Sequence, residues 1–331
     1  MFRLAALALV AAAFAAPAGA NTLQENNQAL FRQMAQVLRL SPTVMARIEQ
    51  IFAGSSIIGQ GNPAITKHPM TPAQCAARIP GGIGAYTNRT FERICGAKYM
   101  APLYDPATQR PQDAKACIDQ FEFPDIPCAY PIVWVKASEA AQLCAAEGKR
   151  ICDAHEWEGA CQGALGPPDY NFSLARGVPM DVAVQRMRLD HNAKYAATKR
   201  WSYGPTYQTG ICAAGSFKSP GCNGGNFNGC GSNTYPAGSF PNCKSPLGVY
   251  DLNGNAAEHM NLPLAPDQMA STGSKTLGVT EMKGSWFIWD SYRAHPDWCR
   301  WRAPFWHGTK VMSPYSHENY HLGFRCCKTI N

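Results

Sequence analysis

Oxygen-bearing side chains recur at short spacing between residues 248 and 260. They are Asp251, Asn253, Asn255 and Glu258, with Gly254 among them. Carboxylate, amide and backbone carbonyl oxygens are the ligands of calcium, which takes about six to eight of them. The spacing differs from that of an EF-hand loop, where the glycine and the final acid come later. By themselves, these residues fit a calcium-binding loop and a polar turn at the end of a strand equally well.

Aromatic, arginine and histidine side chains gather between residues 286 and 321. Aromatic and arginine residues are enriched at binding surfaces, but tryptophans also fill the core of a fold with few regular elements. Half of the eight histidines fall in this segment. A metal site formed by His307, His317 and His321 has little support, because their spacings of ten and four residues are not typical of a metal site.

Four motifs resemble, in order, those of the formylglycine-generating enzyme (sulfatase-modifying factor) family. The central one is Gly-Val-Tyr-Asp-Leu-Asn-Gly-Asn-Ala-Ala-Glu from residue 248. Upstream lies Gly-Lys-Arg-Ile-Cys-Asp-Ala-His-Glu-Trp-Glu from residue 148, and downstream lie Lys-Gly-Ser-Trp from 283 and Gly-Phe-Arg from 323. The resemblance covers roughly residues 115 to 327. It implies the family's α+β, C-type lectin-like fold, with little regular secondary structure and with disulfides and calcium as internal staples.

The resemblance implies a structural calcium ion in the central motif. The family binds this ion through a side chain, two backbone carbonyls and an acid, and the matching positions here are Asp251, Gly254, Ala256 and Glu258. Such an ion pins a loop and performs no chemistry. Another calcium site of the family would lie further upstream, near Asn192, where the ligands do not align.

The copper chemistry of the family lacks its ligands in this chain. Aerobic members oxidise a substrate cysteine to formylglycine with copper(I) held between two thiolates, which are soft ligands that suit this ion. The two matching positions here are Ile288 and Arg293, and neither side chain binds copper. Cys299 is the one nearby thiol, a weak catalytic candidate that we expect to be disulfide-bonded. We therefore expect calcium and no copper as cofactor.

In the family fold, the segment after the third motif lines a ligand groove. The aromatic and arginine residues there predict a groove formed by Trp286, Trp289, Arg293, Trp298, Arg300, Trp301, Arg302 and Trp306. Two functions of different classes follow. One is a protein that binds or acts on a peptide or peptide-derived ligand without copper–thiolate chemistry. The other is an active formylglycine-generating-type oxidoreductase or maturation enzyme with a non-standard site.

Residues 1 to 20 are typical of a secretory signal, in which Arg3 precedes an apolar run that ends in small residues. The run is too short to span a membrane, so we expect an exported, periplasmic or extracellular protein. All 14 cysteines lie after residue 74, and their even number predicts disulfides rather than zinc sites. The net charge is +7, and the lysines and arginines form no block along the chain. Both features give little support for nucleic acid binding.

Apolar residues at helical spacing on either side of Ser41-Pro42 predict a helical hairpin over residues 21–58. Residues 59–114 are rich in proline and glycine and predict an irregular connection, stapled through Cys75 and Cys95. The family domain is expected over 115–331. Within it we expect a helix capped by Ser138, a second helix with a capping box of Asp153 and Glu156, and a long loop over 163–240, ordered by disulfides through Cys212, Cys222, Cys230 and Cys243.

Overall fold

The N-terminal hairpin consists of helix α1 (Leu23–Leu38) and helix α2 (Pro42–Ala53). In this computed structural model, which describes residues 21–222, 225–288, 296–303 and 308–330, α2 begins as the sequence predicts. The Ser41 hydroxyl accepts a hydrogen bond from the Val44 amide, and Pro42 occupies the first helical position. Both helices bury an apolar stripe, made of Leu30, Phe31, Met34, Met45, Ile48 and Phe52.

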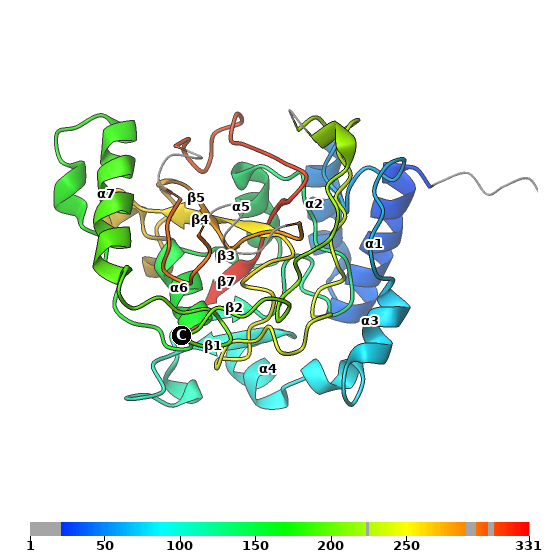
Figure 1. Cartoon of the computed structure of the whole chain (residues 1–331), viewed down its shortest axis with the longest axis horizontal. Coiled ribbons are helices and arrows are strands. Elements are labelled where there is room, and N and C mark those ends of the chain that lie inside the picture. Colours follow the sequence, from blue (N-terminus) through cyan, green and yellow to red (C-terminus); the bar gives the residue numbers. More distant parts are fainter. Residues whose placement is uncertain (1–20, 223–224, 289–295, 304–307, 331) are drawn as a thin grey trace, which may run out of the picture.

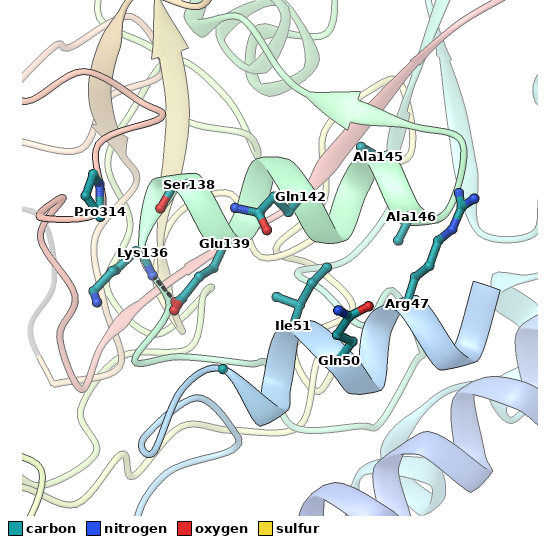
Figure 2. A pocket seen from close by; sticks show the side chains of 11 residues that line it. Arg47, Gln50, Ile51, Lys136, Ser138, Glu139, Gln142, Ala145, Ala146 and Pro314 are labelled. Atoms are coloured by element: carbon teal, nitrogen blue, oxygen red, sulfur yellow. Dashed lines mark hydrogen bonds between the residues drawn. The ribbon is translucent and has the colours of Figure 1, made fainter. Parts of the chain in front are cut away.

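The hairpin packs against helix α5 (Ala137–Ala146), which belongs to the main body of the chain. Leu143 and Cys144 of α5 lie in one apolar cluster with the buried residues of α1 and α2. Towards solvent, a cleft of about 630 Å³ separates α2 from α5. Figure 2 shows Gln50 and Ile51 of α2 facing Gln142 of α5 across this cleft.

Two short helices and two disulfides fasten the connecting region. Helix α3 spans Pro72–Arg78 and helix α4 spans Arg89–Cys95. The Cys75–Cys128 and Cys95–Cys117 disulfides join these helices to the main body, which confirms both cysteines as staples. Short 3-10 turns occur at Ile83–Tyr86, Pro111–Asp113, Phe172–Ala175, Pro220–Cys222, Pro266–Gln268 and Ala270–Thr272.

Two small sheets form the centre of the molecule. The first contains β1 (Met100–Leu103), β2 (Ala116–Asp119), β7 (Cys326–Thr329) and β3 (Arg150–Ile151), in that order and all antiparallel. The second contains β5 (Val279–Lys283), β4 (Ala257–Leu262) and β6 (Leu322–Phe324), in that order. Strand β4 pairs antiparallel with β5 and parallel with β6. The register places Glu258 of the central motif opposite both Lys283 and Gly323, so three of the four motifs meet in one sheet.

All 14 cysteines are paired, in seven disulfides. The two adjacent cysteines at the end of the chain reach different partners, as Cys144–Cys326 and Cys152–Cys327. The remaining pairs are Cys161–Cys299, Cys212–Cys243 and Cys222–Cys230. The disulfide framework predicted from the cysteine count is therefore confirmed, and no described helix is long and apolar enough to cross a membrane.

Helix α6 (Ala154–Gln162) has the predicted capping box of Asp153 and Glu156. The prediction that Ser138 caps α5 was wrong. The N-cap is Lys136, and its backbone amide donates to the carboxylate of Glu139. The predicted long loop over 163–240 contains a 16-residue helix, α7 (Met180–Tyr195). In Figure 1, α7 lies at one end of the long axis, and α1 and α2 lie at the other.

The helical spacing of α7 escaped prediction because part of its buried face is polar. Ala183, Val184 and Met187 supply a short apolar stripe, but Arg188 and His191 continue that face into the protein. A hydrophobic pattern of only three residues is too weak to indicate a helix of this length. The partners of Arg188 and His191 lie far away in sequence, and they explain how these polar side chains are buried.

Candidate functional site

The central motif is a tightly bent loop packed backbone against backbone. Asp251, Gly254 and Asn255 have positive φ angles of 56°, 109° and 55°. A Cβ atom on Gly254 would lie 2.6 Å from the carbonyl oxygen of Ala213, so only glycine fits at this position. The Asn255 amide donates to the same Ala213 oxygen at 2.8 Å. Asn255 Oδ1 accepts from the Tyr235 amide at 2.9 Å, which ties the loop to the segment before it.

Two buried carboxyl groups lie beside this loop. Asp251 Oδ2 accepts from the Gly238 amide and Glu122 Oε1 accepts from the Ala256 amide at 3.2 Å. The second oxygen of each, Asp251 Oδ1 and Glu122 Oε2, is buried with no hydrogen-bond partner among the described residues. Burial raises the pKa of Asp251 to about 7. Burial and the charge of Asp251 raise the pKa of Glu122 well above its ordinary value.

Glu258, the last acid of the motif, forms a buried bidentate ion pair with Arg325. Arg325 Nη2 and Nε donate to Glu258 Oε1 and Oε2, each at 2.6 Å. The indole of Trp157 donates to Glu258 Oε2 at 3.0 Å, and Arg325 also donates to the carbonyl of Tyr250 at 3.0 Å. Trp157, Glu258 and Arg325 come from three different motifs. The motifs that carry the family resemblance thus converge on one charge pair.

The first and last of the predicted calcium ligands, Asp251 and Glu258, differ in their hydrogen bonding. Asp251 keeps a buried oxygen with no hydrogen-bond partner among the described residues, as a ligand for a hard cation would. Glu258 has both oxygens occupied by Arg325, whose guanidinium already supplies the positive charge. A calcium ion at Glu258 would have to bind alongside this guanidinium. Calcium at Asp251, Gly254, Ala256 and Glu258 therefore stays a prediction.

Asn192, near which the other calcium site was expected, has its amide engaged elsewhere. Asn192 Nδ2 donates to the Arg302 carbonyl at 2.7 Å, and Asn192 Oδ1 accepts from the Arg302 amide at 2.8 Å. This paired hydrogen bond holds α7 on the segment that follows Cys299. The side-chain oxygen of Asn192 thus has a structural role in this fold.

A small hollow lies where the third motif meets the central loop. Gly284 has a φ of 74° and brings Ser285 next to Asp297, whose Oδ2 accepts from the Ser285 hydroxyl at 2.7 Å. The indole of Trp201 donates to Asp297 Oδ1 at 2.8 Å, and Asn253 Nδ2 donates to the Asp297 carbonyl at 2.7 Å.

The hollow beside this hydrogen-bonded group has a volume of about 20 Å³, enough for roughly one water. Tyr203, Tyr207 and Gln208 lie at its other side. Sequence reasoning missed these three residues because they follow no motif. They are brought to Ser285 by the Cys212–Cys243 bridge and by the pairing of Trp201 with Asp297.

Neither Cys299 nor the two positions that match the copper ligands offers a free thiolate. Cys299 is buried and bridged to Cys161, as expected from sequence. Ile288, at the first copper position, is buried in an apolar cluster with Phe287 and Val133. Arg293, at the second, lies outside the described residues. The described part of the chain therefore offers no thiolate pair next to Ser285 and Trp286.

The structure describes five of the eight predicted groove residues. Trp289, Arg293 and Trp306 lie outside the described residues. Trp298 is buried, and Trp301 is half-buried. Trp286 is also largely covered, and its indole stacks on the imidazole of His321 with ring centroids 4.2 Å apart. Trp286 directly follows Ser285, which lines the hollow.

Arg300 and Arg302, which were predicted to line a groove, are both buried in ion pairs. Arg302 Nε donates to Glu158 Oε1 at 2.8 Å, and its guanidinium stacks over the ring of Tyr170. Arg300 Nη1 donates to Asp169 Oδ2 at 3.0 Å. Each arginine is held by an acid far away in sequence, and a recognition surface cannot be inferred from residue type alone.

A buried charge network between α6 and α7 surrounds these arginines. Glu158, Asp169 and His191 place ligand-type atoms within 4.8 Å of one another, the one such group of three among the described residues. Lys283 Nζ donates to Glu158 Oε1 at 3.1 Å, in addition to Arg302. Because cationic side chains already neutralise both acids, a metal ion would meet competing positive charge. The arrangement is a structural ion network, and His317 and His321 form no group of three ligands among the described residues.

Replacing Glu158 by glutamine should flatten the acid dependence of stability. Burial alone would raise the pKa of Glu158, but Arg302 and Lys283 lower it to about 2. An acid with a lowered pKa stabilises the fold above its unfolded pKa, and this contribution fades as pH falls towards 2. The loss amounts to about 3 kcal/mol. Urea unfolding between pH 2 and 5 should show it in the wild type and not in Glu158→Gln, while Asp113→Asn, at an exposed pair, should resemble the wild type.

Comparison with known proteins agrees with the motifs. The chain matches the family model described as the sulfatase-modifying factor enzyme 1-like domain, over residues 64–330. None of the curated proteins matches. Among solved structures, the crystal structure of CarF is similar at 16% identity, covering 61% of this chain and 68% of that chain with a TM-score of 0.29. The matched region begins at residue 64 rather than 115, so most of the Pro- and Gly-rich segment is part of the family domain. With most of its length matched, the chain belongs to the sulfatase-modifying factor (formylglycine-generating enzyme) family.

Proposed function

We propose that this protein binds a peptide or peptide-derived ligand beside the Ser285 hollow, without copper–thiolate oxidation. The observation that carries this proposal is the state of the cysteines. All of them lie in disulfides, and a buried isoleucine, Ile288, takes the first copper position. The family's copper(I) site uses a pair of thiolates, which are soft ligands that suit this ion, and this chain has none to offer at that place.

The surroundings of the hollow suit a ligand with amide groups. Tyr203, Tyr207 and Gln208 offer two aromatic rings, hydroxyls and a carboxamide at its edge. Aromatic rings that carry a polar group are well suited to bind extended chains, because the ring contacts apolar parts and the hydroxyl bonds to polar ones. Asp297 is fixed by Trp201 and Ser285, so the base of the hollow is rigid.

The protein is proposed to work outside the cytoplasm. Seven disulfides are typical of chains that fold in an oxidising compartment, where the bridges persist. The secretory signal expected at residues 1–20 lies outside the described residues. Binding of an exported peptide would match such a location, and it needs neither a redox metal nor a free thiol.

Two measurements test this function. In a competition assay with a copper(I) chelator, the wild type should take up no copper(I), whereas Ile288→Cys with Arg293→Cys should gain about one equivalent. In a peptide-display selection, enriched peptides should bind the wild type and lose at least tenfold in affinity with Tyr207→Ala. Tyr315→Ala is the matched control, because Tyr315 is 87% exposed and does not line the hollow.

Uptake of copper(I) by the wild type, or oxygen-dependent loss of a cysteine thiol from a bound peptide, would contradict the proposal. Either result would favour the oxidoreductase with a non-standard site. Failure to enrich any peptide, or equal binding by Tyr207→Ala and the wild type, would refute the location of the site.

A further inference from the structure

A second pocket, of about 490 Å³, lies between α1 and the segment from Gln60 to His68. This volume is typical of small-molecule sites, which span about 300–1,000 Å³. Tyr130 lines its far side. Much of the pocket comes from residues before 64, where the family match begins. The pocket is separate from the Ser285 hollow, and the two share no lining residue.

The polar side chains that line this pocket are uncharged. Side-chain amides come from Asn21, Asn26, Gln33 and Gln60, and none of the described lining residues is Asp, Glu, Lys or Arg. The larger cleft between α2 and α5 differs, because Arg47, Lys136 and Glu139 line it. Side chains without charge compensate poorly for the loss of water around an ionic ligand. In a mature chain that begins at Asn21, the α-amino group would be the one charge in this lining. Carboxamides donate and accept hydrogen bonds, so they suit neutral groups that do the same.

His68 adds a neutral acceptor. Its Nδ1 lies 2.9 Å from the Thr234 carbonyl, which only accepts, so Nδ1 carries the proton and Nε2 is the acceptor. Burial lowers the pKa of His68 to about 4, which keeps the ring uncharged at neutral pH. The ring stacks on Tyr130, with centroids 3.5 Å apart and planes 11° from parallel. This pair supplies flat apolar surface within a polar pocket.

Several hydrogen bonds hold these groups in place before any ligand arrives. Gln60 Nε2 donates to the Tyr130 carbonyl at 2.8 Å, and the Tyr130 hydroxyl donates to the Met70 carbonyl at 2.8 Å. The side chain of Gln33 on α1 makes no hydrogen bond with another described residue and is therefore available to a ligand. Fixed partners lower the entropy that binding must overcome.

We propose that this pocket binds a neutral saccharide. A sugar ring presents hydroxyls around its edge and a C–H face above and below. The hydroxyls match the carboxamides and His68 Nε2, and the C–H face matches the stacked pair of His68 and Tyr130. A peptide main chain has the same donors and acceptors but a weaker need for a flat apolar wall, so the saccharide is favoured.

The test uses saturation-transfer NMR on the mature chain with three neutral probes, maltose, lactose and diacetylchitobiose. At pH 9, where the α-amino group of a mature chain that begins at Asn21 is largely neutral, at least one should receive saturation, while glucuronic acid, an anionic sugar, should not. Gln33→Trp fills the pocket and should abolish the signal, and Gln33→Ala should weaken binding by up to about tenfold. Gln36→Ala on the same helix, which does not line the pocket, should bind like the wild type. Thermal unfolding of each variant checks that it is folded.

The proposal is overturned if none of the three sugars gives a signal, or if Gln33→Trp binds them as the wild type does. A blocked acetyl-diglycine amide serves as the peptide probe. If it binds in a Gln33-dependent way and the sugars do not, the pocket recognises peptide main chain instead.

Discussion

Replacing Arg325 by methionine should lower the free energy of unfolding by about 3–5 kcal/mol. The change removes the positive charge from Glu258, which is buried and held at both oxygens by this arginine. A buried carboxylate left without its partner must either stay charged in a poor environment or take up a proton. Urea unfolding at pH 7 measures the loss. The exposed pair of Arg110 and Asp113 is the control, because solvent screens this pair and Arg110→Met should change the free energy of unfolding little.

A double variant separates loss of the pair from loss of packing. Glu258→Gln with Arg325→Met removes both charges and should recover part of the stability. A loss by Arg325→Met as small as that by Arg110→Met would show that the pair contributes little. The same variants in calcium and in a chelator test the calcium prediction. A rise in the wild-type Tm with calcium would show that an ion binds alongside Arg325.

Removing both bridges of the adjacent C-terminal cysteines should cost about 7 kcal/mol, more than removing each alone would suggest. While Cys152–Cys327 remains, Cys144–Cys326 closes a ring of only roughly ten residues, worth about 3 kcal/mol in the chain-entropy model. Cys152–Cys327 likewise closes a ring of roughly ten residues while Cys144–Cys326 remains. Once both are gone, Cys161–Cys299 is the nearest remaining bridge, and the second loss then opens a ring of roughly 40 residues, worth about 4 kcal/mol.

Urea unfolding of the wild type, the two alanine pairs and the quadruple variant measures this coupling. Each single pair should cost about as much as Cys222→Ala with Cys230→Ala, a bridge with a sequence separation of 8. The quadruple variant should exceed the sum of the single pairs by about 1 kcal/mol. Additive costs would mean that the bridges stabilise the fold through local packing rather than through the unfolded chain.

Sequence alone predicted the parts of this fold that depend on local chemistry or on motifs. Ser41 and Pro42 begin α2 because a cap and a pre-set φ act within one turn. Asp153 and Glu156 do the same for α6. The family fold followed from four motifs, which the structure brings together around Glu258. The cysteine count predicted disulfides, but their connectivity depends on which chain segments are neighbours in space.

What sequence did not reveal depends on partners far apart in the chain. Arg302 looked like a binding residue, yet Glu158 lies 2.8 Å away across 144 residues of sequence. Arg188 interrupts the apolar helical pattern of α7, although its side chain is buried, because its partner Glu281 lies on β5. The engagement of Glu258 by Arg325 was invisible in the same way. Charged residues are read as exposed by default, and only the fold shows which of them have buried partners.

The position of β7 has a consequence for the order of events in the cell. This strand lies between β2 and β3, so the four-stranded sheet lacks a middle strand until residues 326–329 have been synthesised. Arg325 and the adjacent cysteines arrive at the same moment. Strands β1 and β2 can pair earlier, but β3 has no partner in this sheet until β7 exists. The complete four-stranded sheet, the Glu258–Arg325 pair and two of the seven disulfides therefore cannot form before residues 325–329 have been made.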